Sequence, residues 1–149
     1  MTMAKVIRRV ALELPAKSAF EACLRLLTDA DPSRGVVERR CIPHPPREGS
    51  QILTVVHDRR GERILRARVV ELHPPRLVAT ATEDAGPAVR TTLAVDAKGD
   101  HSVVTLTCDA TTALGVTVGA TGLIDYFLLV RSQRRAARQT LSRLRELAV

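Results

Sequence analysis

Aromatic residues are almost missing from this sequence of 149 residues. It has no Trp, one Tyr (Tyr126) and two Phe (Phe20 and Phe127). The hydrophobic core must therefore consist of aliphatic side chains. Proteins that bind single-stranded nucleic acid without sequence preference usually stack the bases on aromatic rings. With so few rings, the sequence disfavours that mode of binding.

Cysteines and long apolar runs are also scarce. The three cysteines, at positions 23, 41 and 108, are far apart and form no C-x-x-C pair. This spacing is typical of free thiols in a reducing compartment. The longest apolar run, residues 126–130, is far shorter than the ~20 residues that span a bilayer. The N-terminus has no signal-peptide pattern, so we expect a cytoplasmic protein without a membrane span.

Motifs for metal binding, phosphate binding and nucleophilic catalysis are missing from the sequence. Its four His and three Cys residues show no metal-ligand spacing. The G-x-S-x-G, G-x-x-x-x-G-K and G-x-G-x-x-G patterns of hydrolases and nucleotide-binding proteins do not occur. We expect no metal site and no cofactor.

Positive charge, by contrast, is in excess. The net charge is +7, and Lys occurs only at positions 5, 17 and 98, so 20 of the 23 basic residues are Arg. Such an excess favours an anionic partner, while a genome biased toward Arg codons is the alternative explanation. With 45% hydrophobic and 26% charged residues, the chain has the composition of one folded domain over residues 1–149.

Hydrophobic periodicity predicts an α+β domain. Alternation of apolar and polar residues predicts strands at 6–14, 36–42, 50–57, 63–72, 77–83, 88–97 and 101–111. Apolar residues spaced three and four positions apart predict a short helix at 15–27 and a long helix at about 123–148. Strands at hairpin spacing form antiparallel sheets, and the helices must bury their apolar faces. We therefore expect six or seven antiparallel strands with the helices on one face.

The long helix has two distinct stripes. Tyr126, Ala137, Leu141 and Leu144 fall on one stripe at about 100° per residue, which predicts the packing face. A neighbouring stripe consists of arginines, among them Arg131, Arg135 and Arg138.

Two stretches resemble the START-like superfamily, in particular its polyketide cyclase/dehydrase-type members. Leu14-Pro15-Ala16, followed by Phe20-Glu21, is similar to the family's passage from the first strand into the first helix. The stretch 70–77, V-E-L-H-P-P-R-L, is similar to the family's V-x-E-x-x-P-P-x-x-L corner between two strands. The resemblance implies the helix-grip fold, in which a curved antiparallel sheet wraps around a long C-terminal helix.

The resemblance also implies a cavity between the sheet and this helix. It would hold a small hydrophobic or amphipathic ligand such as a lipid, an isoprenoid or a polyketide-like molecule. Small side chains such as Ala79, Ala81 and Thr91 would leave part of the space unfilled. We expect the following residues to contact the ligand: Phe20, Thr54, Thr91, Leu93, Thr105, Leu106, Cys108, Tyr126, Phe127 and Val130.

Whether the protein is an enzyme of the cyclase/dehydratase type stays open at this point. Tyr126 is a candidate for polarising a ligand carbonyl, and the alternative is a core tyrosine whose hydroxyl bonds to backbone. His57 is a candidate general base because His titrates near neutral pH, and the alternative is an exposed residue beside a hairpin turn.

The arginine stripe supports a second hypothesis. Arg131, Arg135 and Arg138 would then bind RNA, the ribosome or an acidic protein, whereas the alternative is a solvated helix face. We favour the small hydrophobic molecule over nucleic acid as the partner, and keep a homodimer as a further alternative.

Overall fold

The computed structural model describes residues 2–59, 61–83, 88–112 and 120–148, with side chains at 5–59, 61–83, 88–110 and 134–148. Within these ranges the chain forms seven strands, two α-helices and one 3₁₀-helix. In chain order they are β1 (Thr2–Leu12), α1 (Ala16–Thr28), η1 (Pro32–Arg34), β2 (Val36–Ile42), β3 (Gln51–Asp58), β4 (Gly61–His73), β5 (Leu77–Thr82), β6 (Ala88–Lys98), β7 (His101–Thr112) and α2 (Ala120–Leu147).

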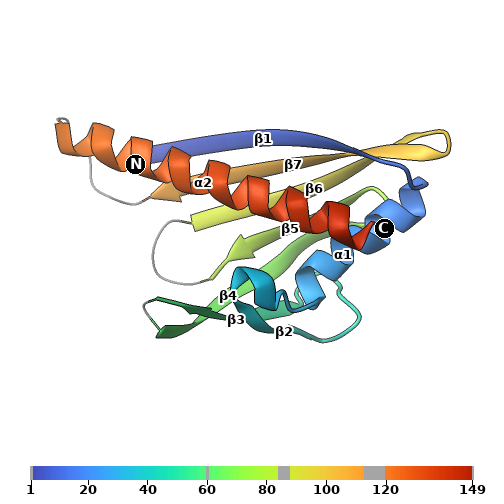
Figure 1. The fold of residues 1–149 in the computed structure, drawn as a ribbon, viewed down its shortest axis with the longest axis horizontal. Coiled ribbons are helices and arrows are strands. Elements are labelled where there is room, and N and C mark those ends of the chain that lie inside the picture. The colour runs from blue at the N-terminus through green and yellow to red at the C-terminus, as the bar shows by residue number, and fades with distance from the viewer. Residues whose placement is uncertain (1, 60, 84–87, 113–119, 149) are drawn as a thin grey trace.

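The seven strands form one antiparallel sheet in the order β1-β7-β6-β5-β4-β3-β2 (Figure 1). Strands β2 to β6 each lie beside the next strand in the chain, and β1 pairs with β7 at the edge opposite β2. Helices α1 and η1 carry the chain from one edge of the sheet to the other. The predicted antiparallel sheet is confirmed.

Both helices lie on the same side of the curved sheet (Figure 1). α2 runs along β1 and β7, and its C-terminal part meets α1. A curved sheet with a long C-terminal helix across its inner face is the helix-grip fold, as predicted. Hereafter the inner face is the side of the sheet that carries the helices, and the outer face is the opposite side.

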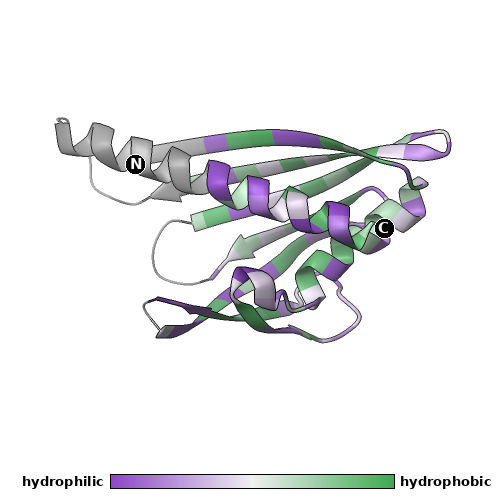
Figure 2. Ribbon diagram, viewed as in Figure 1, coloured by the Kyte–Doolittle hydropathy of each residue, from purple (hydrophilic) through white to green (hydrophobic). Residues whose placement is uncertain are grey.

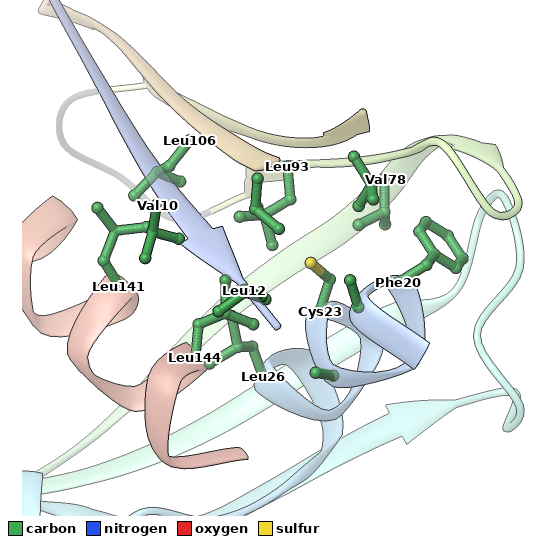
Figure 3. Close-up of a cluster of buried hydrophobic side chains, with 14 of the residues drawn as sticks. Val10, Leu12, Phe20, Cys23, Leu26, Val78, Leu93, Leu106, Leu141 and Leu144 are labelled. Carbon is green, nitrogen blue, oxygen red and sulfur yellow. The ribbon is translucent and has the colours of Figure 1, made fainter. Parts of the chain in front are cut away.

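Strict alternation along the strands builds the core. In β7 every second residue, from Ser102 to Ala110, is buried on the inner face. Figure 2 shows the same alternation of hydrophobic and hydrophilic residues along the strands. Leu141 and Leu144 of α2 pack onto this face beside Val10 and Leu12 of β1 (Figure 3). With Ala137, they confirm this part of the predicted packing stripe.

Gly35 joins η1 to β2 at a point where no side chain fits. Its φ is +82°, which lies in the left-handed region. A Cβ atom at this position would lie 2.7 Å from the backbone oxygen of His57. This close approach lets the Gly35 carbonyl accept a 2.8 Å hydrogen bond from the His57 N–H.

Candidate functional site

The inner face of the sheet has a closed half and an open half. In the closed half, the inward side chains are packed against the helices (Figure 3). These buried residues are Ile52, Val69, Val78, Leu93, Val95, Val104 and Leu106. The closed half is ordinary hydrophobic core.

Further along β3 to β6, the inward side chains are less well covered. Leu65 is 42% exposed although it lies on the same face of β4 as Val69, which is 1% exposed. Seven inward residues of this region are hereafter called the open stretch: Thr54, Val56, Leu65, Ala67, Thr80, Val89 and Thr91. They are adjacent across the sheet, since Thr54 pairs with Leu65 and Thr80 with Thr91. The exposed Arg63 and Thr82 lie on the same face, opposite Val56 and Ala67.

The open stretch combines apolar surface with a few hydroxyl groups. Val56, Leu65 and Val89 supply aliphatic surface, while Thr54, Thr80 and Thr91 supply hydroxyls. Sites for small molecules are mostly apolar with a small number of placed polar groups. The open stretch has this composition.

Cys108 lies at the border between the open and closed halves. It is buried, faces Thr91 across the sheet and shares a side-chain hydrogen bond with it. Burial raises the pKa of the Cys108 thiol, and raises that of Cys23 in the core to about 12. Both thiols are therefore protonated at neutral pH and act as small apolar side chains rather than nucleophiles.

Arg39 reaches the inner face because β2 contains a bulge. The pairing of β2 with β3 shifts between Val36 and Glu38, so that Val37 is an extra residue. Without this shift, the inward position opposite Thr54 would belong to Glu38. With it, Arg39 pairs with Thr54, and Glu38 and Arg40 are exposed.

The Arg39 guanidinium connects β3 to the end of α1. Its Nε donates to Thr54 Oγ1 at 3.2 Å, and Nη1 donates to the backbone oxygens of Leu26 and Asp29. Partial burial lowers the pKa of Arg39 from its ordinary value. Arg39 could not be predicted as a site residue, because the alternation of residues 36–42 contains no signal for the bulge.

A cluster of four charged side chains fixes the end of α2. Arg34 of η1 bonds Asp31 at 2.9 Å and Glu146 at 2.7 Å. Arg143 of α2 lies 3.2 Å from Glu146 and 3.8 Å from Asp31. Burial alone would raise the pKa of Asp31, but hydrogen bonds from Ser33 and Arg34 and the charges of Arg34 and Arg143 lower it below its ordinary value. Hydrogen bonds from Arg34 and Arg143 likewise lower the pKa of Glu146.

Several predicted ligand contacts lie in the closed half. Phe20, Leu93 and Leu106 are 3%, 2% and 0% exposed and pack against other core residues. Thr54 and Thr91, in contrast, are half-buried and belong to the open stretch. The structure therefore separates the predicted set into core residues and accessible ones.

Thr105 and two of the small residues expected beside a cavity lie on the outer face. Thr105 alternates with the buried Val104 and Leu106, so its side chain points away from the helices. Ala79 and Ala81 likewise alternate with the inward Val78 and Thr80. Ala79 is buried by neighbours on the outer face, where Arg90 and Glu71 form a 2.8 Å ion pair. These three residues do not line the inner face.

His57 is exposed at the end of β3 and alternates with the inward Val56. Its side chain therefore lies on the outer side of the sheet, away from the open stretch. This position agrees with the alternative of an exposed residue beside a hairpin turn and removes His57 from a site between sheet and helix.

The predicted residues in the first part of α2 lie outside the described side chains. Tyr126, Phe127, Val130 and Arg131 belong to this group, so their roles stay predictions. Arg135 and Arg138 are described and exposed.

Among the described residues, no three His, Cys, Asp or Glu side chains are grouped so that they could hold a metal ion. No helix within the described ranges has the length and hydrophobicity to cross a bilayer.

The fold resembles many solved structures. A Staphylococcus aureus protein of unknown function, SA2116, matches with a TM-score of 0.79 and 9% identity over 98% of this chain and 93% of that one. The Zhui aromatase/cyclase from Streptomyces sp. R1128 matches with a TM-score of 0.71 and 15% identity over 97% and 93%. The di-domain aromatase/cyclase StfQ has a TM-score of 0.74 and 14% identity over 99% of this chain and 51% of its own length.

These identities are low, and the likeness therefore establishes the fold. The helix-grip fold expected from the sequence is confirmed by these structures. No protein-family model and no curated protein sequence matches the chain.

Proposed function

We propose that the protein binds a small hydrophobic or amphipathic molecule, such as a lipid, an isoprenoid or a polyketide-like compound, between the open stretch and α2. The main support for this proposal is the difference in exposure between the two ends of the inner face. Inward side chains are accessible at one end of a sheet face whose other end is fully packed. Burial of this apolar surface by a ligand is favourable by roughly 25 cal/mol per Å².

Similar structures support a small-molecule function. Zhui and StfQ are aromatase/cyclases, and the similar norcoclaurine synthase was solved with a transition-state analogue. These activities belong to those proteins. They support a small-molecule ligand for a protein of this fold, in agreement with a ligand on the open stretch.

Binding is favoured over catalysis by the polar groups present. The hydroxyls of Thr54, Thr80 and Thr91 donate and accept hydrogen bonds, whereas proton transfer near pH 7 usually requires His or a carboxyl with a shifted pKa. Cyclase or dehydratase chemistry involving Tyr126 stays a separate proposal, since that side chain lies outside the described ones.

A matched pair of variants tests the site. Leu65 and Ile64 are neighbours in β4 with similar exposure, 42% and 51%, but they point to opposite faces of the sheet. We expect Leu65→Gln to weaken binding of the neutral dye Nile red roughly tenfold through lost apolar contact, and Ile64→Gln to leave it unchanged. Fluorescence titration measures both. Equal affinities for both variants and the wild type would exclude the open stretch as the site.

A further inference from the structure

Arg39 carries a charge that no described carboxylate neutralises directly. The two acidic residues whose charges act on it, Asp29 and Asp31, are already paired with other arginines. Asp29 pairs with Arg25 at 3.1 Å, and Asp31 pairs with Arg34 at 2.9 Å. Among the described side chains, no carboxylate lies within ion-pairing distance of the Arg39 guanidinium.

Backbone carbonyls compensate part of this charge. The oxygens of Leu26 and Asp29 at the end of α1 accept hydrogen bonds from Nη1, and the negative end of a helix dipole favours a cation. These are partial charges, however, and a half-buried cation without a full negative partner is costly. The site therefore favours the arrival of an anion.

Two hydrogen-bond donors remain available there. Arg39 Nη2 makes no hydrogen bond to a described residue. Because no fully buried side-chain nitrogen or oxygen in the described residues lacks a partner, this atom reaches solvent. Thr54 Oγ1 accepts a hydrogen bond from Arg39 Nε, which leaves its own proton free to donate. Oxygens of a carboxylate or phosphate accept hydrogen bonds from such donors.

These donors border the apolar part of the site. Thr54 pairs directly with Leu65, which is the most exposed residue of the open stretch. We propose that Arg39 and Thr54 bind the anionic head group of an amphipathic ligand whose apolar chain lies along the open stretch. This inference rests on the proposed function and names the chemical class of its ligand.

Three probes with the same apolar chain test the proposal by isothermal titration calorimetry below their aggregation concentrations. They are dodecanoate, dodecyl phosphate and dodecanol. We expect the wild type to bind at least one of the two anions roughly tenfold more tightly than the alcohol. One hydrogen bond to a charged group contributes enough binding free energy for a difference of this size. The tighter anion identifies a carboxylate or a phosphate head group. If the three affinities are equal, the inference is wrong but the proposed function stands, whereas binding of none contradicts both.

Two variants test whether Arg39 causes the preference for an anionic probe over dodecanol. Arg39→Gln should remove the preference for the anion while leaving the affinity for dodecanol unchanged. Arg40→Gln is the matched control, because Arg40 is the next residue, is exposed and pairs with Glu38. An unchanged preference in Arg39→Gln would overturn the assignment.

Thr54→Val covers the case in which Arg39→Gln does not fold, as judged by circular dichroism. Valine keeps the shape of the side chain and leaves the guanidinium in place. We expect this variant to weaken binding of the preferred anion several-fold with little effect on dodecanol. An equal loss for both probes would mean that Thr54 contributes to packing alone and would contradict the proposed head-group site.

Discussion

At the scale of single residues, Gly35 shows most clearly what the backbone requires. Replacing it with alanine would impose a left-handed conformation on a residue with a Cβ, and that atom would meet the His57 carbonyl at 2.7 Å. We expect Gly35→Ala to lower the free energy of unfolding by about 2–4 kcal/mol, from backbone strain and steric overlap together. Urea denaturation measures this loss.

Gly61→Ala separates the two causes. Gly61 also has a positive φ, +102°, but a Cβ there would have nothing within 4 Å. This variant should lose about 1–2 kcal/mol from strain alone. Equal losses for the two variants would show that the contact with His57 contributes nothing.

Sequence patterns predicted some site residues and missed others for a physical reason. Thr54 and Thr91 were predicted and lie on the open stretch. Thr105 was also predicted, but alternation in β7 points its side chain outward. Arg39 was missed because the extra residue Val37 reverses the alternation of β2. A bulge depends on pairing with the neighbouring strand, and the sequence of one strand does not contain that information.

At the scale of elements, the charged cluster of Asp31, Arg34, Arg143 and Glu146 joins the end of α2 to η1. The buried Asp31 bonds both Ser33 and Arg34. We expect Asp31→Asn to lower the free energy of unfolding at pH 6 by about 1–3 kcal/mol, since it removes the negative charge between two arginines.

The cluster also predicts how stability depends on pH. The pKa values of Asp31 and Glu146 are lower in the folded protein than the ordinary value of about 4. Their contribution is therefore fully present above pH 4–5 and is lost as the pH falls through the folded-state pKa values. Urea denaturation between pH 6 and pH 3 should show the difference between the wild type and Asp31→Asn shrinking. Asp96→Asn, at an exposed position on β6, is the control. A constant difference across this range would contradict the account.

The elements themselves followed closely from local patterns. Alternation located all seven strands, and the spacing of Phe20 and Cys23 located the buried face of α1. The order of the strands could not come from local patterns alone. The pairing of β1 with β7 joins residues about 100 positions apart, such as Val10 with Val104, and was not predicted from the sequence.

At the scale of the whole molecule, the two halves of the inner face have different roles. The closed half, between the sheet, α1 and the end of α2, supplies the packed core. The open stretch leaves apolar and hydroxyl-bearing side chains accessible at the other end of the same strands. Composition suggested an aliphatic interior, but the division into halves depends on where the helices lie. The proposal that the arginine stripe of α2 binds RNA or an acidic protein stays a prediction.

Methyl NMR during titration with dodecanol tests the location of the ligand most directly, because it reports on both faces of the sheet in one experiment. If the ligand lies on the open stretch, the methyl signals of Val56, Leu65 and Val89 shift as dodecanol binds. The signals of Val55, Ile64 and Val103, which lie on the outer face of β3, β4 and β7, should stay in place. Shifts confined to the outer-face residues, or no shift at Leu65 when dodecanol is bound, would contradict a ligand site on the open stretch.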